Sequence, residues 1–125
     1  MQTIGYYSVI QYCPNQLTME VVNVGLVLFV PKLQFLGVRI SDNNNRARKF
    51  FGKDSFDNEW LSAAKMAIKN RLEMLKDSVK ELSEFKKFID TRVNEILLTQ
   101  PKAIKVENAE ETLEVLFHDL VPELR

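Results

Sequence analysis

The sequence predicts an α+β fold, in which helices pack on an antiparallel sheet. Three β-type runs lie within residues 4–40, amphipathic helical patterns follow them, and one more short β-type run comes near the end. Strands grouped first with helices after them are typical of an antiparallel sheet, whereas a parallel sheet alternates strands and helices. We therefore expect an N-terminal three-stranded meander plus one later strand, with helices packed on the sheet.

The composition is that of one globular domain spanning residues 1–125. Hydrophobic residues make up 46% of the chain, and glycine and proline number only four each, which excludes a disordered or low-complexity chain. Cys13 is the single cysteine, so no intramolecular disulfide can form, and we expect a small buried side chain in a reducing compartment. The N-terminus lacks a signal-peptide pattern, and the longest apolar run, Val24–Val30, is too short to span a bilayer. These features predict a cytoplasmic protein that does not enter the membrane.

The strands are predicted from β-branched and aromatic residues. A first strand over Ile4–Cys13 and a second over Val21–Val30 are joined by a short turn, as in an antiparallel hairpin, and Phe35–Ile40 extends it to a meander. The second strand is apolar on both faces, which places it in the middle of the sheet. Strict alternation would put one face on Val22, Val24, Leu26, Leu28 and Val30, and the other on Val21, Asn23, Gly25, Val27 and Phe29.

Helices are predicted where apolar residues recur every three or four positions. Arg46–Phe51 would be a short helix, and Asp57 a suitable N-cap for a longer one. Serines at 78 and 83 favour a break, so we expect two helices rather than one of nearly forty residues. The first would bury Leu61, Ala64, Ile68, Leu72, Leu75, Val79 and Leu82, and the second Phe85, Phe88, Ile89, Val93 and Ile96.

The C-terminal part combines a strand and a helix. Ala103–Val106 predicts the late strand. Asn108 and Glu111 form a capping-box pattern for a final helix, which Pro122 would end.

Two segments resemble a known family. The N-terminal Tyr7-Ser-Val-Ile-Gln-Tyr-Cys-Pro-Asn15 with Glu20-Val-Val-Asn-Val-Gly-Leu-Val-Leu-Phe29, and the C-terminal stretch from Ala109 to Val121, resemble a bacterial family catalogued as domain of unknown function 3037. The resemblance implies neither an activity nor a cofactor. It implies a regulatory or adaptor role, with a kinase resembling HipA toxins as the candidate partner, because family members look like partners encoded near such kinases.

Asn23 is the most informative polar residue, since it interrupts an apolar strand. A buried amide without a hydrogen bond costs roughly 1–3 kcal/mol. In a structural interpretation Asn23 holds a neighbouring loop, and Gly25 allows a close approach. In a functional interpretation Asn23 points into a pocket with Gln11 and Glu20 nearby.

The charge distribution suggests a second candidate surface. The net charge is zero, but residues 46–80 hold nine basic and five acidic side chains, and residues 81–125 hold six and ten. Basic groups neutralise phosphates and aromatic rings stack on bases, so the 46–71 segment is an alternative site for single-stranded nucleic acid. A solvated helix face with packed phenylalanines explains the same pattern. The residues concerned are Arg46, Arg48, Lys49, Lys53, Lys65, Lys69 and Arg71, interleaved with Phe50, Phe51 and Phe56.

No motif predicts a metal site, a cofactor or a catalytic residue. His118 is the only histidine, and no spacing links it to Cys13 or to a set of metal ligands. A non-enzymatic regulatory or adaptor module that binds another protein is therefore the leading hypothesis. An enzyme with a site around Asn23, Glu20, Arg39 and Arg46 is the remaining alternative. Converging polar groups in a deep pocket near the hairpin would favour the enzyme, and a flat apolar patch there would favour the adaptor.

Overall fold

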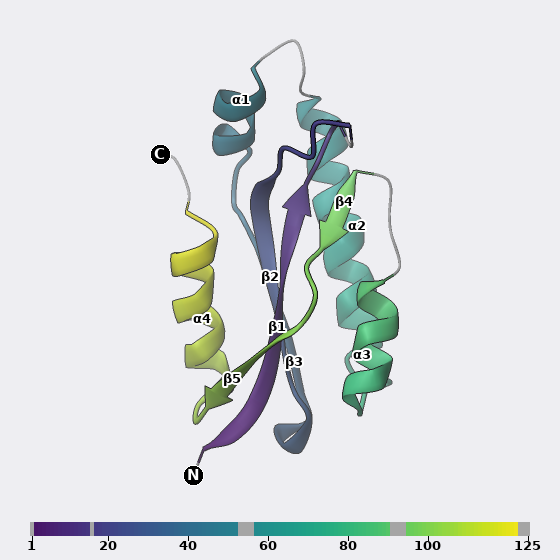
Figure 1. Ribbon diagram of the computed structural model, residues 1–125, viewed down its shortest axis with the longest axis vertical. Coiled ribbons are helices and arrows are strands. Elements are labelled where there is room, and N and C mark those ends of the chain that lie inside the picture. The colour runs from purple at the N-terminus through teal and green to yellow at the C-terminus, as the bar shows by residue number, and fades with distance from the viewer. Residues whose placement is uncertain (1, 16, 53–56, 91–94, 123–125) are drawn as a thin grey trace.

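The computed structural model describes residues 2–15, 17–52, 57–90 and 95–122. Strands come first, helices follow, and two short strands precede the last helix (Figure 1). The elements are β1 (Thr3–Tyr12), β2 (Val22–Val30), the 3-10 helix η1 (Pro31–Leu33), β3 (Phe35–Ile40), α1 (Asn45–Phe51), α2 (Asn58–Leu75), α3 (Leu82–Ile89), β4 (Ile96–Leu98), β5 (Lys102–Val106) and α4 (Ala109–Leu120).

The strands form one antiparallel sheet in the order β3-β2-β1-β4, and β5 also pairs with β1. The predicted α+β class and the N-terminal meander are confirmed. The prediction that the helical pattern continues to Ile96 is wrong, because Ile96–Leu98 is a strand that pairs with the end of β1. Val93, which belonged to the same predicted stripe, lies outside the described residues.

β4 and β5 act as one edge strand that is interrupted around Thr99. The Thr99 N–H donates to the carbonyl of Val9 (3.0 Å), and the Val9 N–H donates back to Thr99 Oγ1 (2.8 Å). The Ser8 hydroxyl donates to the carbonyl of Thr99 (2.6 Å). Side chains thus satisfy polar groups of β1 where the regular ladder stops, as a buried strand requires.

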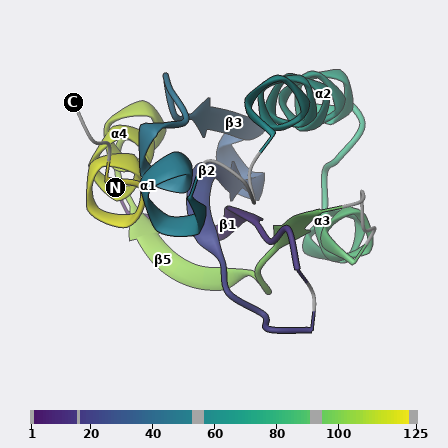
Figure 2. The ribbon, with the colours of Figure 1, turned by 90° about the horizontal axis from the view of Figure 1, so that it is seen from above.

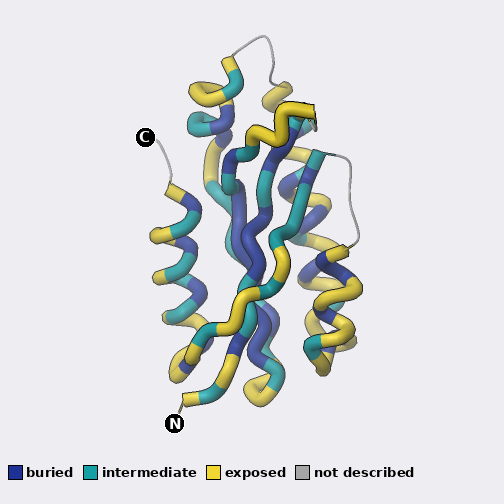
Figure 3. The backbone as a smooth tube through the Cα atoms, viewed as in Figure 1, coloured by how far each residue is buried: buried dark blue, intermediate teal, exposed yellow. Residues whose placement is uncertain are grey.

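Helices cover both faces of the sheet. α2 and α3 lie against one face and α4 against the other (Figure 2). Buried residues run along β1 and β2, between these layers (Figure 3). The α4 side is filled by Val9, Leu26, Leu28, Val30, Val106, Leu113 and Phe117, and the opposite side by Ile10, Val27, Phe29, Leu61, Ile68 and Phe85, among others.

A β-bulge in β2 changes which residues share a face. Ile10 pairs with Gly25, but the next residue of β1, Gln11, pairs with Asn23, so Val24 is an extra residue in β2. A Cβ on Gly25 would lie 2.8 Å from the Arg39 carbonyl oxygen, which explains the glycine at this position.

The predicted strict alternation is therefore wrong. Val22 and Val24 share a cluster with Val27 and Phe29 on the α2 side, whereas Leu26, Leu28 and Val30 face α4. Asn23 and Gly25 likewise lie on opposite faces, because the bulge shifts the alternation by one residue.

The helix starts follow the predicted caps. Asp57 accepts a hydrogen bond from the Trp60 N–H (3.0 Å), and Asn108 accepts one from the Glu111 N–H (3.1 Å). The predicted break is confirmed too, although α2 already ends at Leu75, before Val79 and Leu82 of the predicted stripe. Cys13 is buried, as expected. Among the described helices none combines the length and apolar character that crossing a bilayer requires.

Candidate functional site

Asn23 lies on the α4 side of β2, where it connects the hairpin to the last helix. Its Oδ1 accepts a hydrogen bond from Gln11 Nε2 (3.0 Å), and its Nδ2 donates to the backbone carbonyl of Leu120 (2.8 Å). The last carbonyls of a helix have no intrahelical partner, so Asn23 satisfies one of them in α4. Gln11 is thus beside Asn23, as the functional interpretation expected, whereas Glu20 is exposed in the connection before β2.

A narrow cleft adjoins Asn23 where β2 extends past the end of β3. Besides Asn23, its polar lining comes from Ser41, Asn43, Asn44 and Arg46, and Pro122 borders it after α4. Its volume is about 10 Å³, enough for roughly one water molecule. Small-molecule sites usually measure about 300–1,000 Å³. Asn23 and Arg46 therefore meet, as the enzyme alternative expected, but around a space far smaller than a substrate.

Asn44 and Lys65 form a buried polar cluster behind this cleft. The Asn44 Nδ2 contacts Asn58 Oδ1 (3.0 Å) and Ser62 Oγ (2.9 Å), and Asn44 Oδ1 accepts from Lys65 Nζ (2.9 Å). Lys65 is only 5% exposed, and it also donates to the carbonyl of Asn43 (3.3 Å). The cluster joins the segment before α1 to the first half of α2.

Arg39 lies apart from the cleft, on the face of β3 that α4 covers. It forms an ion pair with Glu114 of α4, and its guanidinium carbon lies 4.5 Å from the centre of the Phe117 ring. Both members of the pair are partly exposed, so the pair contributes little to stability. It orients α4 rather than joining Asn23 in a site.

The basic 46–71 segment does not form one exposed face. Arg48 and Lys49 are exposed on α1, but Lys65 is buried, and Arg71 lies over the ring of Phe88 (5.3 Å). Lys53 and Phe56 of the predicted set lie outside the described residues. The Phe51 ring packs edge-on against Tyr12, at 5.5 Å between centroids.

Tyr12 gives a pH-dependent contribution to stability. Its burial, followed by the nearby carboxylates of Glu95 and Asp57, raises its pKa from 10.0 to about 12. In the unfolded chain the phenol ionises near pH 10, so the folded state keeps the proton longer. The stabilisation is complete below pH 10 and is lost as the pH rises toward 12.

We expect Tyr12→Phe to flatten this alkaline limb. Between pH 10 and 11 the free energy of unfolding of the wild type should fall by about 1 kcal/mol more than that of Y12F. Urea unfolding at both pH values measures the difference, in which the lysines common to both proteins cancel. Equal slopes would contradict the raised pKa.

A cleft with both apolar and charged lining runs along the outer edge of β3. Its volume is about 450 Å³, and it lies between α2 and α4. The Ser41 N–H donates to the Val24 carbonyl (2.8 Å), and hydrogen-bonded pairs alternate in an antiparallel ladder. By that alternation, the backbone groups of Leu36, Val38 and Ile40 face away from β2, toward the edge. The apolar lining comes from Leu36, Val38, Leu72 and Leu113 among others, and the charged lining from Glu73, Lys76 and Glu110.

The opposite edge of the sheet is protected. β4 and β5 form this edge, which is interrupted before Pro101. β5 carries the exposed side chains of Lys102 and Lys105. Proline and lysine on an edge strand hinder its pairing with another chain. β3 carries neither residue, and its one charged residue, Arg39, is turned onto α4. The two edges therefore differ in their capacity to accept another strand.

Comparison with known families places the chain in one of them. Residues 7–121 match a family described as "Protein of unknown function (DUF3037)". The chain belongs to the DUF3037 family. The match takes in the β1–β2 hairpin and α4, which contain the two segments that carried the resemblance. No curated protein and no solved structure matches this DUF3037 chain.

Two features of this DUF3037 protein cannot be predicted from sequence patterns. The contact between Asn44 and Lys65 joins a loop to a helix, and neither residue type signals burial. The β3 cleft can be predicted only if Phe35–Ile40 is known to be an edge strand, and that depends on the order of all the strands in the sheet. His118 is exposed, and the described residues contain no group of three metal-ligating side chains.

Proposed function

We propose that this DUF3037 protein is a non-enzymatic adaptor that binds an extended segment of another protein along β3. The outward-facing backbone of β3 is the observation that supports it. An added strand would hydrogen-bond with Leu36, Val38 and Ile40 and place alternate side chains in the cleft. Main-chain pairing supplies affinity in this mode, and the cleft supplies specificity.

The family resemblance suggests the partner. A kinase resembling HipA is the candidate, and the adaptor would act as its regulator in the cytoplasm. The charged residues of the cleft favour a segment whose central side chains are apolar and whose flanks carry charge of both signs. Glu73 lies in the last turn of α2, Lys76 is its C-cap, and Glu110 lies in the first turn of α4.

Val38→Pro tests the mode of binding. The Val38 N–H faces the edge, so proline removes a donor needed by the added strand without removing a bond to β2. We expect affinity for the partner to fall at least about tenfold, because 1.4 kcal/mol corresponds to a factor of ten. The partner is first recovered by pull-down from the native cell with mass spectrometry, and its affinity is then measured by calorimetry.

Val38→Ala is the matched control. It removes the same packing of the half-buried side chain but keeps the N–H. A much smaller loss of affinity in V38A than in V38P supports strand addition. Equal affinities in all three proteins would contradict it, and a dimer in light scattering that V38P abolishes would identify a second copy as the occupant.

Nucleic-acid binding through α1 is a second candidate function. It is favoured by consecutive exposed side chains, since Arg48 and Lys49 precede Phe50, which is itself largely exposed. A mobility shift of an oligothymidylate at low salt, weakened by the double change R48A/K49A, would support it. No complex at low salt would exclude it.

A further inference from the structure

A groove lies between β5 and the first half of α4. Its volume is about 370 Å³, and it lies near the N-terminus, where the chain turns from β5 into α4 (Figure 1). Its apolar lining comes from Ile104 of β5 and from Val115 and Leu116 of α4. Val115 is 55% exposed, and the other two side chains are half-buried. Both walls of the groove therefore leave apolar surface in contact with solvent.

The shape of the groove fits a segment of a protein better than a small molecule. Small-molecule sites bury about 70–90% or more of the ligand surface. Here much of the lining is itself exposed, including Lys105, Glu107, Glu111 and Val115. An occupant that takes the apolar side chains out of water must also extend over this rim, as a peptide segment does.

That segment gains little from pairing with the sheet. Strand addition is disfavoured at β5, because Lys102 and Lys105 are exposed on it and Pro101 precedes it. A helix satisfies its own backbone N–H and carbonyl groups, so it can contact a groove through its side chains alone. The occupant of this groove is therefore expected to be helical.

The rim of the groove is acidic. α4 and the turn before it contain five acidic side chains and no lysine or arginine. Glu111 lies one turn before Val115 and Asp119 one turn after it, so carboxylates flank the exposed apolar side chain. Glu107 adds a further carboxylate to the lining, and Lys105 is the one basic residue among its described members. Such a surface attracts a basic segment and repels the phosphates of a nucleic acid.

We propose that this groove binds a basic amphipathic helix of a second protein. Apolar side chains of that helix contact Ile104, Val115 and Leu116, and its lysines or arginines pair with Glu107 and Glu111. The groove shares no lining residue with the β3 cleft, so this proposal stands or falls independently of the proposed function. α4 lies between the two sites, and the adaptor thereby joins two proteins.

A synthetic helical peptide is the probe for the apolar contact. It has about 18 residues, with leucines on one face and lysines on the other, and calorimetry at low salt measures its affinity. Val115→Gln should weaken binding about fivefold, because the groove loses an aliphatic contact. Glutamine is a good helix former, so the melting temperature should stay unchanged.

Leu17→Gln is the matched control for this change. It removes an aliphatic side chain that is 96% exposed and lies outside the groove, so the peptide should bind this variant as it binds the wild type. Equal affinity of V115Q and the wild type overturns the proposal. Absence of binding to the wild type at low salt overturns it too.

The double change E107Q/E111Q tests the charge complementarity. It should weaken binding of the peptide about tenfold and reduce the dependence of the affinity on salt. E59Q/D77N removes two exposed acids elsewhere and is the matched control. The same peptide with glutamate in place of lysine should not bind. An equal loss in E59Q/D77N would mean that the peptide responds to the overall charge, and would overturn the site.

Val38→Pro separates this groove from the β3 cleft. V38P should bind the lysine peptide as the wild type does, and in ¹⁵N spectra the peptide should shift amide resonances of β5 and the first half of α4. A loss in V38P with no loss in V115Q would place the peptide in the β3 cleft. That result overturns the groove and leaves strand addition at β3 intact.

Discussion

Phe29→Ala should lower the free energy of unfolding by about 4 kcal/mol. Phe29 is 1% exposed in the central strand β2, and its ring packs 5.2 Å from that of Phe85 in α3. Removing the ring leaves a cavity between the sheet and α3, which β2 cannot fill because both its neighbouring strands hold it in place. Urea unfolding followed by circular dichroism measures the change.

Phe50→Ala is the control for this substitution. It removes the same side chain from a position that is 54% exposed, so the loss should stay below about 1 kcal/mol. If both variants lost the same amount, α3 would not pack on β2 as described.

Asn44→Ala should lower the free energy of unfolding by about 3 kcal/mol. The change removes the hydrogen bonds to Asn58 and Ser62 and takes the Asn44 oxygen from the buried, charged amino group of Lys65. Thermal and urea unfolding measure the loss. Asn70→Ala, on an exposed position of α2, should stay within about 0.5 kcal/mol of the wild type.

A double-mutant cycle tests whether the interaction between Asn44 and Lys65 contributes to this loss of stability. Asn44→Leu combined with Lys65→Met removes both buried polar partners at once, and the pair should lose less than the sum of the single changes. Strict additivity would mean that the two side chains do not interact in solution.

Elements with a local signal were predictable from the sequence. The caps at Asp57 and Asn108 act through a side chain and an N–H three residues apart, so a short window contains both partners. The hairpin is equally local, since a short turn joins two β-type runs. Its residues also carried the family resemblance that the match over residues 7–121 confirms.

Features that depend on distant partners were not predictable. Nothing in Ile96–Leu98 distinguishes a strand from another turn of helix until β1 is available to pair with it. The bulge at Val24 is set by the register of two strands, and one apolar residue more or less in a fully apolar strand leaves no trace in its pattern. The predicted faces of β2 therefore failed beyond that residue.

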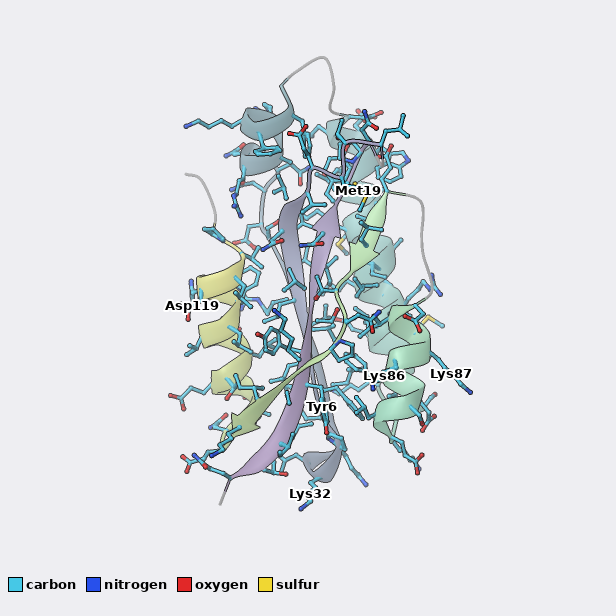
Figure 4. The ribbon with its side chains drawn as sticks, viewed as in Figure 1. Tyr6, Met19, Lys32, Lys86, Lys87 and Asp119 are labelled. Carbon is cyan, nitrogen blue, oxygen red and sulfur yellow. The ribbon has the colours of Figure 1, made fainter. Side chains whose placement is uncertain are left out.

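The same reasoning applies to the candidate site. Asn23, Gln11 and Arg46 were singled out because they are polar in conspicuous places, and the structure brings Asn23 close to both. Glu20 and Arg39 were included for the same reason but lie elsewhere. Glu20 is exposed before β2, and Arg39 pairs with Glu114 of α4, which comes from the far end of the chain. The lysines labelled in Figure 4, which are Lys32, Lys86 and Lys87, are exposed and belong to η1 and α3, away from these sites.

The interrupted edge strand has a consequence for how the protein is made. Thr99 bonds to Ser8 and Val9 across 91 and 90 residues, so β1 lacks its second neighbour until the C-terminal third has been synthesised. At about 5–20 residues per second, roughly 4–15 s separate the completion of β2 from that of β5 on the ribosome. During that interval the free edge of β1 and the face that α4 later covers are both exposed. The apolar strand β2, which is buried in the finished protein, is then accessible to chaperones. The strands that complete the sheet are thus made well after the hairpin that they join.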